Sequence, residues 1–214
     1  MKLTEEQIVK NYNTFEAIVD NYITGERKEK VKAMLEKIGD EMAIAPAAGK
    51  SWFHGAYPGG YLVHVIGVVK SAIKLTKFYE DMGGKVDYTM EEIVFAALFH
   101  DLGKLGNGEL PNYIPQDNEW RRNNLQEIYV NNPELDFMLV PDRSLFVLQK
   151  FGIQVDQKEW LGIKLHDGVF DESNKAYFSA NKPDSRLKTN LVYVLHVADY
   201  LASKFETDIE ESQK

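Results

Sequence analysis

The segment FAALFHDLGKL places a histidine and an aspartate, His100 and Asp101, side by side at the end of an apolar stretch. Successive helical residues lie roughly 100° apart around the axis, and Gly103 indicates that the helix ends here, so both side chains leave the same end of one element. An imidazole nitrogen and a carboxylate oxygen together suit manganese, iron, cobalt, nickel or zinc. A metal site with positions open to water can activate that water as a nucleophile, so this pair predicts metal-assisted hydrolysis.

Further metal ligands are expected from two other apolar segments, YLVHVIGVVKSA with His64 and VLHVADYLASKFE with Asp199. A histidine on an apolar helix is by itself more often a hydrogen-bonded core residue than a ligand, whereas a carboxylate beside an apolar stripe needs a metal, a donor or a cation as its partner. A His-Asp pair at a helix end can equally be a cap or an ion pair. If the three segments pack side by side as helices, they bring all these side chains together.

The periodicity of apolar residues predicts an all-α fold that would hold these residues in place. Long helices are expected over 3–20, 27–42, 61–79 and 184–205, together with a strongly apolar helix over 90–101 that begins after Thr89. Shorter helices are expected at 119–131, 133–137, 142–151 and 157–165. Glycine and proline mark irregular segments at 46–60, 106–120 and 166–183, and residues 206–214 are expected to form a polar, frayed tail.

Composition limits the kinds of protein that this chain can be. Its 214 residues include no cysteine, so any metal must be held by nitrogen and oxygen atoms. Hydrophobic residues make up 44%, and no apolar run approaches the roughly 18 residues needed to span a membrane, which predicts a folded domain without a membrane partner. The first residues lack the apolar stretch of a secretion signal, so a cytoplasmic location is expected. A net charge of -8 disfavours broad attraction to an extended nucleic acid but leaves a small nucleotide admissible.

Taken in order, the segments YLVHVIGVVKSA, FAALFHDLGKL and VLHVADYLASKFE resemble the H...HD...D signature of HD-domain metal-dependent phosphohydrolases. The resemblance extends over residues 43–206 and implies a single HD-type helical bundle, with N-terminal helices in 1–42 packed on it and the polar tail at 207–214. It further implies that a metal ion activates water against a phosphoester and is bound by His64, His100, Asp101 and Asp199. Asp101 is then a catalytic residue as well as a ligand.

Three more histidines are candidates for roles at this site. Many HD enzymes have additional histidines between the HD pair and the last aspartate that bind a second metal, and here the candidate ligand is His166, followed by Asp167. His54 lies in a loop before the first ligand and would bind substrate phosphate or a second metal, unless it only packs within the loop. His196 lies one turn before Asp199 and either binds the metal or, as we favour, orients a carboxylate from behind it.

Lys104 follows the HD pair, as a lysine does in many HD enzymes, and is expected to bind substrate phosphate and take part in catalysis. The competing interpretation is an ordinary solvated lysine. Further basic candidates for phosphate contacts, each individually more typical of a surface charge, are Arg121, Arg122, Arg143, Lys164 and Arg186. Several aromatic residues lie in or beside the expected site loops and could stack a base, although core packing explains most aromatic residues. They are Trp52, Phe53, Tyr57, Tyr113 and Trp120.

These patterns leave the substrate open. A nucleotide or a related small phosphoester is favoured, hydrolysed with one or two divalent transition-metal ions. The segment PAAGKSWFHGAYPGGYLVH also resembles bacterial HD-domain exoribonucleases that act from the 3' end, but this sequence lacks their preceding nucleic-acid-binding barrel. Alternatives are therefore a 3'-5' exoribonuclease-like enzyme, a cyclic-nucleotide phosphodiesterase and a noncatalytic nucleotide-binding regulator. The last alternative is a helical interaction module whose histidines are structural. Metal analysis of the purified protein would separate this alternative from the others.

Overall fold

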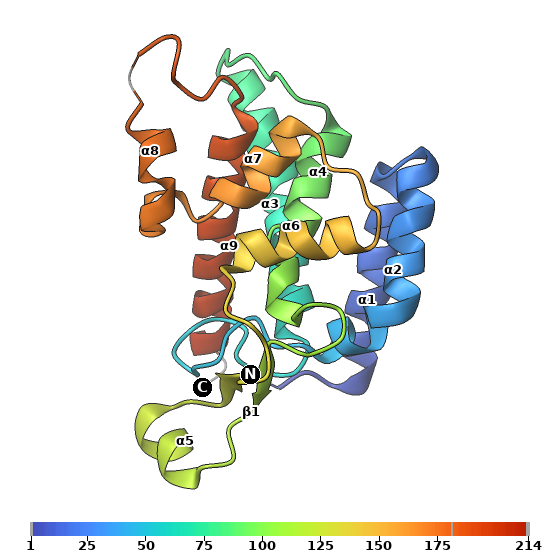
Figure 1. Cartoon of the computed structure of the whole chain (residues 1–214), viewed down its shortest axis with the longest axis vertical. Coiled ribbons are helices and arrows are strands. Elements are labelled where there is room, and N and C mark those ends of the chain that lie inside the picture. Colours follow the sequence, from blue (N-terminus) through green and yellow to red (C-terminus); the bar gives the residue numbers. More distant parts are fainter. Residues whose placement is uncertain (1, 181, 213–214) are drawn as a thin grey trace.

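The computed structural model describes residues 2–180 and 182–212, and these form a mostly helical structure (Figure 1). Its α-helices are α1 (Glu5–Tyr22), α2 (Gly25–Ile44), α3 (Gly60–Asp81), α4 (Met90–Phe99), α5 (Glu119–Leu125), α6 (Val140–Lys150), α7 (Gln157–Leu165), α8 (Lys175–Phe178) and α9 (Leu191–Ser212). Shorter elements are the 3-10 helices η1 (Leu102–Leu105), η2 (Gly168–Phe170) and η3 (Glu172–Asn174) and the strands β1 (Tyr113–Pro115) and β2 (Tyr129–Asn131). The prediction of an all-α fold is confirmed.

Helix α4 lies at the centre of the packing because it is apolar on nearly every side. Every residue from Ile93 to Phe99 is buried, as expected of a helix without a polar face. It packs against α1, α3, α7 and α9, and α3 and α9 also lie against each other. The helix begins as predicted, with a capping box between Thr89 and Glu92. The end of α4 is therefore enclosed by the same helices that carry the other candidate ligands.

Of the two N-terminal helices, α1 packs on α3 and α4, and α2 packs on α3. Phe15 and Val19 of α1 are fully buried. The Phe15 ring meets the Phe99 ring edge-on, with 6.2 Å between the ring centroids. Figure 1 shows α1 and α2 together on the side of the molecule away from α8 and α9. They therefore complete the core on the side opposite the long C-terminal helix.

The C-terminal helix α9 differs from the sequence-based prediction at both ends because tertiary contacts decide where it begins and ends. It begins at Leu191 and not near residue 184. At this start, the Thr189 hydroxyl accepts a hydrogen bond from the Leu191 N–H. It continues to Ser212, so the expectation of a frayed tail is wrong up to that residue, while residues 213–214 lie outside the described part. The last turns are anchored because Glu206 is buried against α3.

Residues 106–131, expected to form a long loop followed by a helix, contain a small β-hairpin. Strand β1 pairs antiparallel with β2, with Ile114 opposite Val130. Helix α5 lies between the two strands in the chain and ends at Leu125, because the next residue, Gln126, has a φ of 48° that is incompatible with a continuing right-handed helix. The predicted helix at 119–131 is thus shorter than expected, and the one at 133–137 does not form. Figure 1 shows the hairpin and α5 projecting from one end of the bundle.

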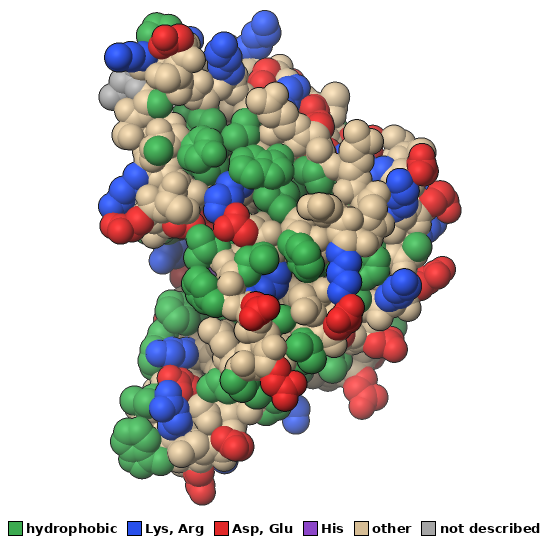
Figure 2. Space-filling view, viewed as in Figure 1, with side chains coloured by type: hydrophobic (Ala, Val, Ile, Leu, Met, Phe, Trp, Pro, Cys, Tyr) green, Lys and Arg blue, Asp and Glu red, His purple; other side chains and the backbone are tan. Residues whose placement is uncertain are grey.

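The surface of the molecule bears on the kinds of partner it could contact. None of the helices within the described residues combines the length and the apolar character needed to cross a membrane. Figure 2 shows acidic and basic side chains interspersed on the face that it draws. That face therefore offers no broad cationic surface to an extended nucleic acid.

Candidate metal centre

Four side chains from three parts of the chain converge at one point. His64 in α3 places Nε2 3.0 Å from Asp199 Oδ1 in α9 and 3.4 Å from Asp101 Oδ2. His100 directly follows α4, and its Nε2 lies 3.4 Å from Asp101 Oδ2 and 3.7 Å from Asp199 Oδ1. The side chains of His64, His100 and Asp101 are almost fully removed from solvent. The structure thus brings together the four residues that the sequence pattern singled out.

His166 joins this group from the end of α7. Its Nε2 lies 3.6 Å from Asp101 Oδ1, and its ring lies 4.7 Å from the His100 ring at an angle of 80°. Ligand atoms of His64, His100 and Asp101 lie within 4.8 Å of one another, and so do those of His100, His166 and Asp199. Both groups have the atom types and the spacing to hold a metal ion, and they share His100.

Hydrogen bonds on the far side of the rings determine which nitrogen faces the centre. The Nδ1–H of His100 donates to the Ala97 carbonyl oxygen at 2.8 Å, and that of His166 donates to the Ile163 carbonyl oxygen at 2.8 Å. Nε2 of each ring can then present a lone pair to a metal. The Nε2 atoms of His64 and His100 are buried and have no hydrogen-bond partner among the described residues. Buried polar atoms are normally satisfied, so these two fit metal ligands better than core histidines.

The turn that carries the His-Asp pair is held in place by α6. Ser144 Oγ accepts a hydrogen bond from the Gly103 N–H at 2.8 Å and donates one to the His100 carbonyl oxygen at 2.8 Å. A Cβ atom at residue 103 would collide with the carbonyl oxygen of Val140. Glycine at this position therefore lets α6 approach closely enough to fix the ligand-bearing turn.

The buried carboxylate of Glu206 is a feature of the site that the sequence analysis missed. Its Oε2 lies 3.2 Å from His64 Nδ1 and its Oε1 lies 3.3 Å from the same atom, so it can accept the hydrogen bond of Nδ1–H. Gly67 in α3 leaves room for it, since a Cβ there would lie 3.1 Å from Oε1. Glu206 lies about two turns after Asp199 on α9, and this spacing on one helix face was the available signal. Its contact orients His64 toward the centre.

Ion pairs keep the carboxylates of Asp101 and Asp199 charged. Burial by itself would raise the pKa of Asp101, but Lys104 and His100 lower it more, so this pKa lies well below its usual range. Burial likewise opposes ionisation of Asp199, and contacts with His100 and His64 hold its pKa well below the usual range. Burial would lower the pKa of His166, but Asp167 and Asp101 raise it to about 9. A metal ion would therefore meet two carboxylates and would displace a proton from His166.

A cavity of about 250 Å³ opens beside these residues, and Lys104 lines it. The Lys104 Nζ lies 2.6 Å from Asp101 Oδ2, and the lysine side chain is only 19% exposed. Burial would lower the pKa of Lys104, but Asp101 raises it above its ordinary value, so the ammonium group stays charged. Lys104 is therefore not an ordinary solvated lysine, and its pairing with a candidate ligand was not foreseen.

The remaining predicted histidines border the site in different ways. His54 lines the cavity with its ring 4.7 Å from that of His64. Burial and the nearby His64 and Lys104 lower the pKa of His54 to about 3, so it is neutral at neutral pH. His196 donates from Nδ1 to the His166 carbonyl oxygen at 2.6 Å. It therefore supports the main chain of a candidate ligand, and its role in orienting a carboxylate stays a prediction.

The other basic residues proposed for phosphate contacts have structural roles or lie elsewhere. Arg143 is 5% exposed and donates to the Gly103 carbonyl and to Asn112 Oδ1, so the phosphate role suggested for it is wrong. Arg121 pairs with Glu127. The residues that line the cavity do not include Arg121, Arg122, Arg143, Lys164 or Arg186.

The aromatic lining of the cavity also differs from the prediction. Phe53 and Tyr113 line a neighbouring hollow of about 320 Å³, and Tyr57 is buried. The described aromatic residues that line the cavity with the candidate ligands are Phe170 and Tyr200. Sequence reasoning passed over both, although Tyr200 directly follows Asp199.

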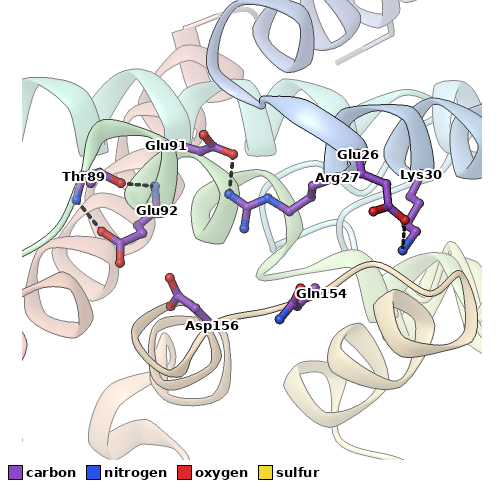
Figure 3. Close-up of a pocket in the computed structure, with 8 residues that line it drawn as sticks. All are labelled: Glu26, Arg27, Lys30, Thr89, Glu91, Glu92, Gln154 and Asp156. Carbon is purple, nitrogen blue, oxygen red and sulfur yellow. Dashed lines mark hydrogen bonds and ion pairs between the residues drawn. The ribbon is translucent and has the colours of Figure 1, made fainter.

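A larger cavity of about 420 Å³ lies between α2, α4 and the segment before α7. Figure 3 shows Arg27 directed at Glu91 and Lys30 directed at Glu26 within it. Arg27 also pairs with the fully buried Glu159 at 2.6 Å. Because these charges already have partners, the smaller cavity at the histidines is the better candidate for chemistry.

Comparisons with models of known protein families, with curated proteins and with solved structures found no match for this chain. The helical fold and the buried histidine and aspartate cluster are compatible with an HD domain.

Proposed function

We propose that this chain is an HD-type metal-dependent phosphohydrolase that acts on a nucleotide or a related small phosphoester. The observation that carries the proposal is that the buried Nε2 atoms of His64 and His100, which have no hydrogen-bond partner among the described residues, face the carboxylates of Asp101 and Asp199. His166 completes the set on the side of Asp101 Oδ1. Imidazole and carboxylate ligands favour a divalent transition metal, one ion or two.

A bound ion would polarise a phosphoryl oxygen and lower the pKa of water at the site. The chain's own residues would supply the rest. Lys104 brings a buried positive charge to the cavity and would hold the substrate phosphate and offset negative charge that develops on its oxygens. His54 is neutral, and its Nε2 has no hydrogen-bond partner among the described residues, so it is available to a phosphate oxygen. The enclosed position of Asp101 limits access of bulk water to the ligands.

Metal analysis combined with a phosphatase assay tests this proposal. Purified protein would be stripped with a chelator, reconstituted with manganese, cobalt, nickel, zinc or magnesium, and assayed with 4-nitrophenyl phosphate and bis(4-nitrophenyl) phosphate. We expect binding of a transition metal and hydrolysis of one of the two esters, with both lost in Asp101→Ala. A chain that binds no transition metal, or one that hydrolyses neither these esters nor any nucleotide while metal-loaded, would contradict the proposal.

A further inference from the structure

One wall of the cavity at the candidate metal centre is aromatic and open to solvent. The rings of Phe170 and Tyr200 stack with 6.2 Å between their centroids and 11° between their planes, and both residues line the cavity. Phe170 is 75% exposed and Tyr200 is 47% exposed. A phenylalanine side chain left in water forgoes the favourable free energy of burying its apolar surface. An exposed aromatic surface at the mouth of a charged cavity is therefore typical of a ligand-binding surface.

The Phe170 ring is presented by a segment with fixed geometry. Gly168, with a φ of 59°, packs against the His196 ring, which a Cβ at residue 168 would overlap. The Gly168 carbonyl oxygen accepts a hydrogen bond from Nδ2 of the fully buried Asn174 at 3.1 Å. The Phe170 N–H donates to the Asp167 carbonyl oxygen at 3.2 Å. These contacts fix the main chain that carries the exposed ring, so little backbone freedom would be lost when a ligand stacks on it.

The aromatic wall is tied in sequence and space to the candidate ligands. Tyr200 directly follows Asp199 on α9, and Phe170 ends the short helix η2 that follows His166. Lys204 Nζ lies over the Tyr200 ring, 5.2 Å from its centroid. Tyr200 thus contacts both a lysine and Phe170, and Phe170 is the more exposed of the two rings. The same cavity contains Lys104, which would hold phosphate.

The size of the cavity indicates where each part of a substrate would lie. At about 250 Å³ it is smaller than the roughly 300–1,000 Å³ of pockets that enclose a drug-sized ligand. A phosphate at the ligands would occupy the enclosed, charged part. A larger substituent would then extend to the rim, where Phe170 offers a flat apolar face.

We infer that Phe170, backed by Tyr200, is a stacking platform that selects phosphoesters carrying a flat heteroaromatic ring, as nucleotides do, over sugar phosphates without a ring of this kind. This inference rests on the proposed function and specifies the substrate of the same site. Base–aromatic stacking tolerates every base, because each base has a π face. The platform should therefore favour nucleotides as a class with little preference among purines and pyrimidines.

The test compares 5'-AMP with ribose 5-phosphate, which share the pentose and the phosphate and differ in the base. Both the kcat/KM values and the affinities measured by calorimetry would be determined with protein reconstituted with manganese. We expect wild-type protein to favour 5'-AMP and Phe170→Ala to weaken its use or binding by about 5-fold to 150-fold, the range expected for loss of one stacked base. Ribose 5-phosphate should be affected less than twofold, and Phe170→Trp should preserve the preference.

Phe78→Ala is the matched control, since Phe78 is also an exposed phenylalanine, 60% accessible, and lies outside this cavity. It should leave both ligands unaffected. Equal use of 5'-AMP and ribose 5-phosphate by wild-type protein, or an equal loss of both in Phe170→Ala, would overturn the stacking platform while leaving phosphoester hydrolysis intact. A change of oligomeric state in Phe170→Ala without a change in preference would also overturn it and assign the ring to a protein contact. If neither compound binds and no phosphoester is hydrolysed, the proposed function fails as well.

Discussion

Glu206→Ala is the substitution that most directly probes how the site is built. The variant removes the carboxylate that lies 3.2 Å from His64 Nδ1 and leaves that nitrogen without its acceptor in a buried position. His64 can then rotate or adopt the other tautomer, so Nε2 is no longer held toward Asp101 and Asp199. Loss of such a supporting carboxylate typically lowers metal affinity 10-fold to 100-fold, which corresponds to about 1.4–2.8 kcal/mol. Because both partners are buried, we expect a loss toward the upper end of this range.

Metal affinity would be measured by competition with a fluorescent chelator, so that the result does not depend on turnover. Glu206→Gln keeps an oxygen that can accept the hydrogen bond but lacks the charge, and it should give an intermediate affinity. Glu211→Ala removes an exposed acidic residue one turn further along α9 and serves as the control for nonspecific effects on the helix. Unchanged metal affinity in Glu206→Ala, or an equal loss in Glu211→Ala, would refute the role assigned to Glu206.

Four further expectations concern the candidate metal centre and the buried Arg27–Glu159 ion pair. Asp101→Ala should abolish metal retention and hydrolysis together, as measured by metal content and phosphatase activity; retention of both would exclude this site. Chelation should remove activity, and a transition metal should restore it better than calcium, because nitrogen ligands disfavour calcium; activity unaffected after exhaustive chelation would count against the metal mechanism. Lys104→Ala should keep the metal stoichiometry and lower kcat/KM about tenfold or more, the loss expected for a charge-assisted contact to phosphate, whereas wild-type kinetics would remove Lys104 from substrate binding. Arg27→Ala should destabilise the fold by about 3 kcal/mol at pH 8, because it leaves Glu159 buried without its cation. Burial raises the pKa of Glu159 from 4.5 to about 7, so the folded state holds a proton that the unfolded state releases, and stability decreases as pH rises through this window. The loss in Arg27→Ala should therefore be smaller at pH 5, and denaturant unfolding showing equal losses at pH 5 and pH 8 would contradict the assignment.

Much of the candidate site could be predicted because local chemistry marks it. Histidine and aspartate at the end of an apolar helix, and an aspartate within another, are unusual enough to indicate a partner. The structure brings His64, His100, Asp101 and Asp199 together as the helical pattern required. His166 lies beside them although its spacing alone left its role open.

Contacts between distant segments account for what the sequence analysis missed or assigned wrongly. The role suggested for Arg143 was wrong because its donors are used by main-chain and amide oxygens that only the folded turn around η1 brings near. The contact of Glu206 with His64 depends on the space that Gly67 leaves for the Glu206 carboxylate in α3. Phe170 became a candidate only because η2 sets it beside Tyr200.

The sequence by itself determined the helical class, the capped start of α4 and the residue types at the centre, because periodicity and side-chain chemistry are properties of short segments. It could indicate which face of a helix is apolar but not which residue of another helix covers that face. Only the tertiary structure decided that α9 continues to Ser212, that Glu206 supports His64 and that Lys104 pairs with Asp101. These outcomes depend on the packing of α3, α4 and α9 against one another, where burial and hydrogen bonding between residues far apart in the chain outweigh local preference.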